Sequence, residues 1–370
     1  MIAASCVVAV LLYSQLLSGG GRGTAVNATV AATPAESSSS STPTLLLTSS
    51  PLPSTEPPGD ALQRLERVYS ASERRALASR YLFVRGYAKS GTSWSKMLID
   101  LHEDIYMFPN ELQLGLIDDG VARAVSSPWQ ASFEPYRSVV LQWAQQLVFR
   151  IMEVARVLEP TALYVGEKSP KAVVPIVDGA RYVYVVRDGR DVLVSLMAHR
   201  VRIGGFADWC PGDRMFASPE AHAAASLRDW SFFERRPHEL LAHEPCVRHL
   251  VQHWTHRVSA DLAALAAHNA SLFLILPYEQ VARDPEAERR RVYTWLGLDP
   301  ARSKPLGLYT MPLAGLPPDS EYRPQNLFFR KGEPGDWRNF FTDDVKRLFK
   351  SVPGAQALLQ QLGHVADDTW

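Results

Sequence analysis

The sequence predicts an α/β fold with a central parallel β-sheet flanked by helices. Two segments carry this prediction, residues 81–99 and residues 182–200, and each reads as a strand, a glycine-containing turn and a helix. Their apolar runs, Y-L-F-V and Y-V-Y-V-V, are rich in the aromatic and β-branched residues typical of buried strands. Because parallel strands deliver their turns to the same carboxyl edge of a sheet, we expect one ligand site built from both turns.

Length and composition are those of a globular protein. The chain has 370 residues, of which 46% are hydrophobic and 21% are charged. The formal net charge is zero, so no overall positive field favours nucleic acid, and we expect no nucleic-acid partner. The three cysteines lack metal-ligand spacing, and we expect no catalytic metal. Cys210 and Cys246 either form one disulfide or stay unpaired, and the sequence leaves both open.

The first 59 residues differ from the rest in composition. Residues 1–17 are largely apolar and uncharged, but shorter than the roughly 20 residues of a usual membrane helix; they predict a short signal-anchor or a signal-peptide core. Residues 18–59 are rich in Ser, Thr and Pro and are expected to form a disordered stem. This order predicts a single-pass type II protein of the Golgi membrane, with a secreted or a plastid protein as the alternative. Asn27 and Asn269 begin glycosylation sequons.

The folded domain is expected to span residues 60–370, with Asp60 as the N-cap of its first helix. After the strand and helix of residues 81–99, helical spacing resumes over residues 136–158. One apolar face of that helix is expected to lie in the core and comprises Trp143, Leu147, Ile151, Val154 and Leu158.

Three further stretches follow. Residues 162–175 read as a strand feeding a loop that holds Glu167, Lys168 and Pro170. Residues 200–260 show no clear strand, and a loop of this length is expected to be a lid or a binding segment, followed by a helix from Trp254. Its six histidines have no ligand geometry and are expected to be mostly solvated.

The last part of the chain alternates strand and helix signals. A strand at residues 273–276 precedes a helix that ends at Gly297. Near the C-terminus, Thr342 is expected to cap a helix that begins at Asp343.

The first turn has the glycine spacing of a phosphate-binding loop. Gly86 and Gly91 occupy the glycine positions of G-x-x-x-x-G-K-[ST], but Thr92 stands in the lysine slot and the lysine is Lys89. Loop N–H groups and the N-terminus of the following helix would point at an anion. A lysine at this position could reach a group leaving the 5′ end of a nucleotide. The alternative is an ordinary turn with a solvated lysine.

The second turn and a C-terminal stretch supply further positive charge. The second strand runs directly into Arg187, whose guanidinium could form a fork on a phosphate, and Ser195 follows two turns into the helix. The alternative is that R-D-G-R-D is a solvated charge run. Arg330 and Lys331 precede Gly332, whose backbone can approach an anion closely.

Together, residues 80–365 resemble the sulfotransferases that use 3′-phosphoadenosine 5′-phosphosulfate (PAPS), in a three-layer P-loop-like fold. Four stretches carry the resemblance in order: K-S-G-T-S-W, V-V-R-D-G-R-D-V-L-V-S, L-P-Y-E-Q-V-A-R-D-P and R-K-G-E-P-G-D-W. The resemblance implies that the 5′-phosphosulfate is bound by Lys89, Ser90, Gly91, Thr92 and Ser93. It implies that the 3′-phosphate is bound by Arg187, Ser195, Arg330, Lys331 and Gly332, and that Trp94 and Tyr278 contact the adenine.

The catalytic base departs from the cytosolic pattern. Where cytosolic members carry K-T-H, this chain has Lys168 followed by Ser and Pro, and E-K-S-P resembles the membrane-anchored carbohydrate and protein sulfotransferases instead. Those draw their base from a glutamate after the first helix, which implies Glu111 here, with Lys89 and Lys168 stabilising the sulfuryl group. His102 and His199 are the reserve candidates, and a surface role for Glu111 is the alternative.

The implied reaction is in-line sulfuryl transfer from PAPS to a hydroxyl or amine, without a metal. The acceptor is expected to be a glycan or a secreted protein, by analogy. Two rival functions are a P-loop kinase or nucleoside triphosphatase, and a non-catalytic nucleotide-binding protein. The sequence does not indicate the oligomeric state.

Overall fold

The computed structural model describes residues 70–109, 111–112, 114, 134–170, 177, 179–203, 210, 214–306 and 330–370. The predicted anchor, the stem, the sequon at Asn27 and the helix expected from Asp60 lie outside these residues. None of the helices within the described ranges combines the length and the apolar character needed to cross a membrane.

The centre of the fold is a five-stranded sheet in which every neighbouring pair is parallel, with the order β2-β3-β1-β4-β5. The strands are β1 (Tyr81–Gly86), β2 (Ile105–Met107), β3 (Tyr164–Lys168), β4 (Arg181–Val186) and β5 (Phe273–Pro277). The strand that precedes the first predicted turn, β1, pairs with both β3 and β4, so it lies in the middle of the sheet. The predicted α/β fold with a central parallel sheet is confirmed.

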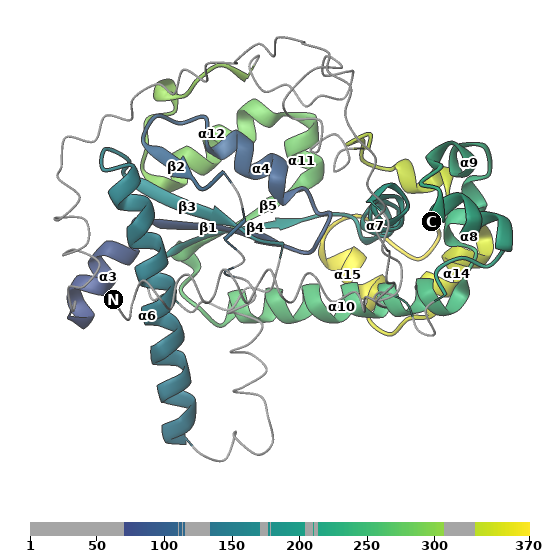
Figure 1. Cartoon of the computed structure of the whole chain (residues 1–370), viewed down its shortest axis with the longest axis horizontal. Coiled ribbons are helices and arrows are strands. Elements are labelled where there is room, and N and C mark those ends of the chain that lie inside the picture. Colours follow the sequence, from purple (N-terminus) through teal and green to yellow (C-terminus); the bar gives the residue numbers. More distant parts are fainter. Residues whose placement is uncertain are drawn as a thin grey trace, which may run out of the picture. The chain divides into compact units, whose positions relative to one another are not determined.

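Both faces of the sheet are covered, which makes three layers. All six residues of β1 are buried, and its side chains alternate between two cores. Leu82 and Val84 pack with the helices α4 (Thr92–Ile99), α11 (Tyr278–Arg283) and α12 (Pro285–Leu296). Tyr81 and Phe83 face α6 (Glu134–Leu158) and the end of α10 (Glu244–Ala266). Figure 1 shows these two helix layers on opposite sides of the sheet.

The remaining elements complete the described ranges. They are α3 (Ala71–Ala78), α7 (Gly189–Ile203), α8 (Pro219–Ser226), α9 (Trp230–Arg235), α14 (Asp343–Ser351), α15 (Ala355–Gln361) and the short 3₁₀ turns η2 (Pro237–Leu241), η3 (Ala270–Leu272), η4 (Pro300–Arg302) and η6 (Asp336–Asn339). Thr342 caps α14 as predicted, because its side chain accepts a hydrogen bond from the Val345 amide.

The predicted core face of α6 is wrong, because the buried stripe is displaced from it by about one residue. The buried side chains are Ala144, Val148, Phe149, Met152 and Ala155. Leu147, Ile151 and Val154 are only partly buried, Leu158 is 54% exposed, and the side chain of Trp143 lies outside the described part. Apolar residues cover more than half of this helix, so periodicity alone could not choose between two adjacent stripes.

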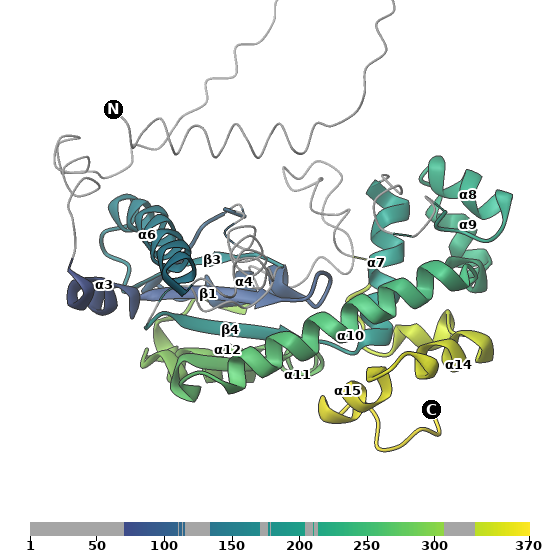
Figure 2. The same ribbon diagram turned by 90° about the horizontal axis from the view of Figure 1, so that it is seen from below.

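The described part of residues 200–260 is largely helical, contrary to the prediction of a loop. After α7 this stretch forms α8, α9 and η2, and α10 begins at Glu244, ten residues before the predicted start. Its side chains build a core of their own with α7, α14 and α15, in which Phe233 and Cys246 are fully buried. Figures 1 and 2 both show α7, α8, α9 and α14 grouped beyond the end of β4. Cys210 and Cys246 form a disulfide.

The strand β3 extends further along the chain than predicted. Glu167 and Lys168 are its last two residues and are buried, whereas the sequence suggested a loop. Arg85 on β1 forms a buried ion pair with Glu167. This pairing allows a charged residue in the middle of a sheet, because a buried charge needs a partner.

Candidate active site

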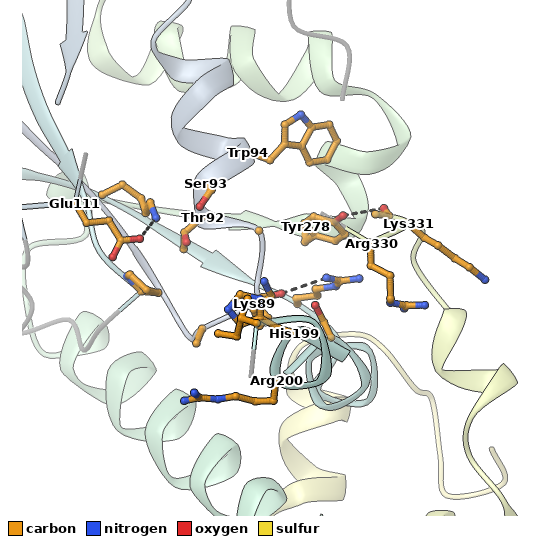
Figure 3. Close-up of a pocket in the computed structure, with 18 residues that line it drawn as sticks. Lys89, Thr92, Ser93, Trp94, Glu111, His199, Arg200, Tyr278, Arg330 and Lys331 are labelled. Atoms are coloured by element: carbon orange, nitrogen blue, oxygen red, sulfur yellow. Dashed lines mark hydrogen bonds and ion pairs between the residues drawn. The ribbon is translucent and has the colours of Figure 1, made fainter. Parts of the chain in front are cut away.

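A cavity of about 460 Å³ opens where β1, β3 and β4 end. Of the residues predicted from the sequence for the donor site and for catalysis, all line it except Ser90, whose side chain is buried, and the reserve base His102. Figure 3 shows Glu111 at one end and Trp94, Tyr278, Arg330 and Lys331 at the other, with Lys89 and His199 between them. The tertiary structure therefore brings together residues that are more than 240 positions apart.

The first turn adopts a conformation that its glycines permit. Gly91 has φ +98°, and a Cβ atom there would lie 2.3 Å from the ring of Tyr278, so the ring occupies the space that a side chain would need. Gly91 is also the N-cap of α4 and offers no side-chain acceptor, which leaves the first amides of the helix available to an anion.

Lys89 is the loop residue under most strain. Its φ is +69°, a left-handed conformation that costs a residue with a Cβ atom about 1–2 kcal/mol. Burial lowers the pKa of its ammonium group to about 7, and the positive charges of Arg187, Arg202 and Lys168 contribute. A bound anion would therefore strongly stabilise the charged form of the Lys89 ammonium group.

Arg187 connects the first turn with the second, which it begins. Its Nη1 donates to the carbonyl oxygen of Lys89 at 3.2 Å, and its guanidinium lies 4.1 Å from the ring centroid of Tyr278. Its Nε has no hydrogen-bond partner among the residues that the structure describes. Ser195 lines the cavity from the next helix, α7.

The charge run after Arg187 is buried, so the alternative of a solvated run is wrong. Asp188, Arg190 and Asp191 are at most 6% exposed. Asp188 holds Arg190 through both carboxylate oxygens, and Asp191 accepts hydrogen bonds from the amides of Gly335 (2.6 Å) and Trp337 (2.9 Å). Asp191 thereby attaches the C-terminal stretch to the start of α7.

The C-terminal stretch adds two cations. Arg330 forms an ion pair with Asp336, and Lys331 Nζ donates to the other oxygen of Asp336 at 3.0 Å. Burial raises the pKa of Asp336, but Arg330 and Lys331 hold it below its usual value overall. The hydroxyl of Tyr278 donates to the carbonyl oxygen of Gly332 at 2.7 Å, which joins this stretch to the wall of the cavity.

At the opposite end, Glu111 and Lys168 form an ion pair. Both side chains line the cavity, and so does His199. His102 does not: it is buried against Tyr293, with its Nε2 2.9 Å from the carbonyl oxygen of Asp299. The structure removes His102 as a candidate base, because its imidazole has no access to the cavity.

The cavity suits a ligand with negative charge at two places. Among the described lining residues one is acidic, Glu111, whereas the cationic ones are Lys89, Lys168, Arg187, Arg200, Arg330 and Lys331. Trp94 and Tyr278 meet edge to face with centroids 5.7 Å apart and give an aromatic surface between the two turns. No cluster of three or more potential metal ligands occurs within the described ranges.

The model of the sulfotransferase domain family matches residues 79–363. The chain belongs to the sulfotransferase family. It is therefore a PAPS-dependent sulfotransferase with PAPS as co-substrate, as the sequence predicted, and the cations at both ends of the cavity fit the 5′-phosphosulfate and the 3′-phosphate of that molecule.

Solved structures give more distant matches, and no curated protein sequence matches the sulfotransferase. A mouse sulfotransferase complexed with PAP is 18% identical, with 78% of this chain and 89% of that chain covered and a TM-score of 0.41. The sulfotransferase domain of the Synechococcus PCC 7002 olefin synthase is also 18% identical, with 73% and 93% covered and a TM-score of 0.39.

Four lining residues of the sulfotransferase were not predicted as site residues from the sequence: Ala88, Pro170, Arg200 and Ile203. Ser195, His199 and Ile203 are four residues apart along α7, so helical spacing from Ser195 could have indicated the last of them. Arg200 carries no such signal, because neighbouring cations on a helix are most often solvated.

Proposed function

We propose that this sulfotransferase transfers the sulfuryl group of PAPS to a hydroxyl or amine of a glycan or a secreted protein and releases adenosine 3′,5′-bisphosphate. The observation that carries the proposal is one cavity lined by cations along its length, from Lys168 and Lys89 to Arg330 and Lys331, with the aromatic rings of Trp94 and Tyr278 beside Arg330 and Lys331. Lys89 and residues 90–93 would hold the 5′ end. Arg187, Ser195 and residues 330–332 would hold the 3′-phosphate. Trp94 and Tyr278 would contact the adenine.

In the proposed step the acceptor oxygen attacks sulfur while the bond from sulfur to the bridging phosphate oxygen breaks. The acceptor proton passes to the Glu111 carboxylate, and the bisphosphate leaves with the bond electrons. Lys89 and Lys168 stabilise the charge that develops on the transferred group and on the leaving oxygen. The ion pair between Lys168 and Glu111 supports this assignment, because it holds both groups at the same end of the cavity. His199 is the second candidate for the base.

A lumenal location in the Golgi, with residues 1–17 as a membrane anchor, is part of the proposal. The disulfide between Cys210 and Cys246 supports an oxidising compartment. Asn269 is exposed, so its sequon would be open to glycosylation. Imaging of the tagged full chain beside a Golgi marker, with deletion of residues 1–17 as the comparison, tests this placement. Plastid or secreted signal from the full chain would contradict it.

The donor site is tested by calorimetric titration of the full chain with adenosine 3′,5′-bisphosphate and, separately, with ATP–Mg²⁺. We expect metal-independent binding of the bisphosphate that is lost in Arg187→Ala. A preference for ATP–Mg²⁺ would favour a kinase, and binding of neither nucleotide would favour a non-catalytic protein.

The base is tested by Glu111→Gln. The amide cannot accept the acceptor proton, so turnover is expected to fall about 10²–10⁴-fold while bisphosphate affinity stays nearly the same. Turnover is measured with radiolabelled PAPS and a mixture of glycan acceptors. An equal loss of turnover and of nucleotide affinity would contradict the assignment, and a loss in His199→Ala alone would transfer it to His199.

A further inference from the structure

Arg330 has three close partners, two of which, Trp230 and Phe340, the sequence did not connect with the site. Its guanidinium carbon lies 5.7 Å from the ring centroid of Trp230 on α9 and 5.3 Å from that of Phe340. The third partner is the carboxylate of Asp336. Both aromatic distances are within the range in which a ring face attracts a cation.

The indole of Trp230 is itself fixed in place. Its Nε1 donates to Glu234 at 3.0 Å, one turn later on α9, and its ring stacks on that of Phe233 with centroids 6.0 Å apart. Phe233 is fully buried in the core that α9 shares with α7 and α14. The ring face presented to Arg330 therefore belongs to a rigid part of the fold.

Arg330 needs such support because positive charge surrounds it. Lys331 is next in the chain, and Arg202 lies close enough that Arg330, after burial, helps to lower the pKa of Arg202. Among the described residues, Nε and Nη1 of Arg330 have no hydrogen-bond partner, so hydrogen bonds alone do not define its position. Repulsion would move a flexible arginine away from this cluster, whereas two ring faces compensate part of that repulsion.

We propose that Trp230 is a positioning residue for the 3′ end of the donor: with Phe340, its ring holds Arg330 where it binds the 3′-phosphate. The segment around α9, which the sequence suggested as a lid or a binding segment, thus sets the preference for nucleotides that carry a 3′-phosphate. This inference rests on the proposed function, in which Arg330 binds that phosphate.

The test compares two ligands on the full chain by calorimetry, adenosine 3′,5′-bisphosphate and adenosine 5′-phosphate. The ratio of their dissociation constants measures the contribution of the 3′-phosphate. Trp230→Leu keeps apolar bulk but removes the ring face, so we expect the ratio to fall about five- to tenfold, with the 5′-phosphate constant changed by less than about twofold. Trp230→Phe restores a ring and is expected to keep most of the preference.

Two further variants make the result specific. In an Arg330→Ala background, Trp230→Leu is expected to have no further effect on the ratio, because Trp230 acts through Arg330. Phe232→Leu is the matched control on the same helix, since its ring faces Arg236 at 5.3 Å, and it is expected to keep the wild-type ratio.

Other outcomes overturn the inference in distinguishable ways. If the wild-type chain shows no preference for the bisphosphate, the proposed donor site fails, and the inference fails with it. If the wild-type chain prefers the bisphosphate and Trp230→Leu keeps that preference, the inference alone is wrong. If Trp230→Leu weakens the binding of both ligands equally, Trp230 has only a structural role. The same holds if Trp230→Leu lowers the ratio of dissociation constants as much in the Arg330→Ala background as in the wild type.

Discussion

Lys89 combines a left-handed backbone with a side chain in a positive environment. Its carbonyl oxygen accepts a hydrogen bond from Arg187, so the same guanidinium that supports the strained turn also repels the Lys89 ammonium group. Strain of this kind persists only where surrounding contacts compensate for it, which is common at functional sites. An anion between the two groups would relieve the repulsion.

The pH dependence of binding follows from the lowered pKa. In the free protein Lys89 titrates at about 7 instead of 10.5, and a bound anion raises that pKa again. Bisphosphate binding at pH 8 is therefore expected to take up protons, measured by calorimetry in buffers of different ionisation enthalpy. Affinity should decrease as the pH rises through 7. Lys89→Ala should remove the proton uptake and reduce turnover about 10²–10³-fold.

The stability of the free protein should increase as the pH rises, whereas the affinity for the bisphosphate decreases. Between about pH 7 and 10.5 the unfolded chain binds more protons at Lys89 than the folded chain does, so this residue makes the free energy of unfolding rise with pH over that interval. Urea unfolding of wild type and Lys89→Ala at several pH values measures the difference. Identical slopes in the two proteins would contradict the lowered pKa.

Gly91→Ala should damage the site more than the fold. The new Cβ atom would lie 2.3 Å from Tyr278, whose ring is held by Arg187 and by its hydrogen bond to Gly332. Displacing that ring is expected to weaken bisphosphate binding at least about tenfold. Gly297→Ala is the matched control, because Gly297 also has a positive φ (+76°) but nothing within 4 Å of its Cβ position. Equal effects of both variants on binding would contradict this reading.

At the scale of elements, the C-terminal stretch depends on the first turn of α7. Asp191 accepts hydrogen bonds from two amides of the C-terminal stretch. The guanidinium carbon of Arg190 lies 4.0 Å from the ring centroid of Trp337. The cations Arg330 and Lys331 therefore reach the cavity because a buried carboxylate attaches their segment to the helix that follows β4. Nothing in the spacing of R-D-G-R-D indicated this partner.

Asp191→Ala tests this attachment. The buried amide of Trp337 and the partly buried amide of Gly335 would lose their acceptor, so the free energy of unfolding is expected to fall by about 2–4 kcal/mol. The affinity for the bisphosphate should fall more than that for adenosine 5′-phosphate, because in the proposed function residues 330–332 would hold the 3′-phosphate. Asp343→Ala, at an exposed position of α14, is the control. Unchanged selectivity in Asp191→Ala would show that the stretch stays in place without it.

At the scale of the whole molecule, the protein has a third core in addition to the two that cover the faces of the sheet. This core joins α7, α8, α9, α10, α14 and α15, and it contains both Cys210 and Cys246. The helix α7 belongs to this core and also lines the cavity, so the stability of the helical part influences the geometry of the site.

The disulfide is expected to stabilise this part of the molecule. It closes a loop with a sequence separation of 36 residues, which corresponds to about 4 kcal/mol in the chain-entropy treatment. Reducing agent, or Cys210→Ser with Cys246→Ser, should lower the midpoint of thermal unfolding. Cys6→Ser is the control. An unchanged midpoint in the double variant would show that the bond contributes nothing.

The α/β class, the strands β1, β4 and β5, the cap at Thr342 and nearly all residues that line the cavity could be predicted from the sequence alone. These features depend on short-range spacing: a strand, a glycine turn and a helix together place Lys89 or Arg187, whatever the rest of the chain does.

The tertiary structure was needed to show which stripe of α6 is buried, that residues 219–260 are largely helical, that Cys210 pairs with Cys246, and that His102 lies outside the cavity. It also brought Trp230 to Arg330 and Asp191 to residues 335–337. Each of these depends on contacts between residues far apart in the chain. Periodicity and local propensity describe only neighbours, so they carry no information about which distant partner a side chain will meet.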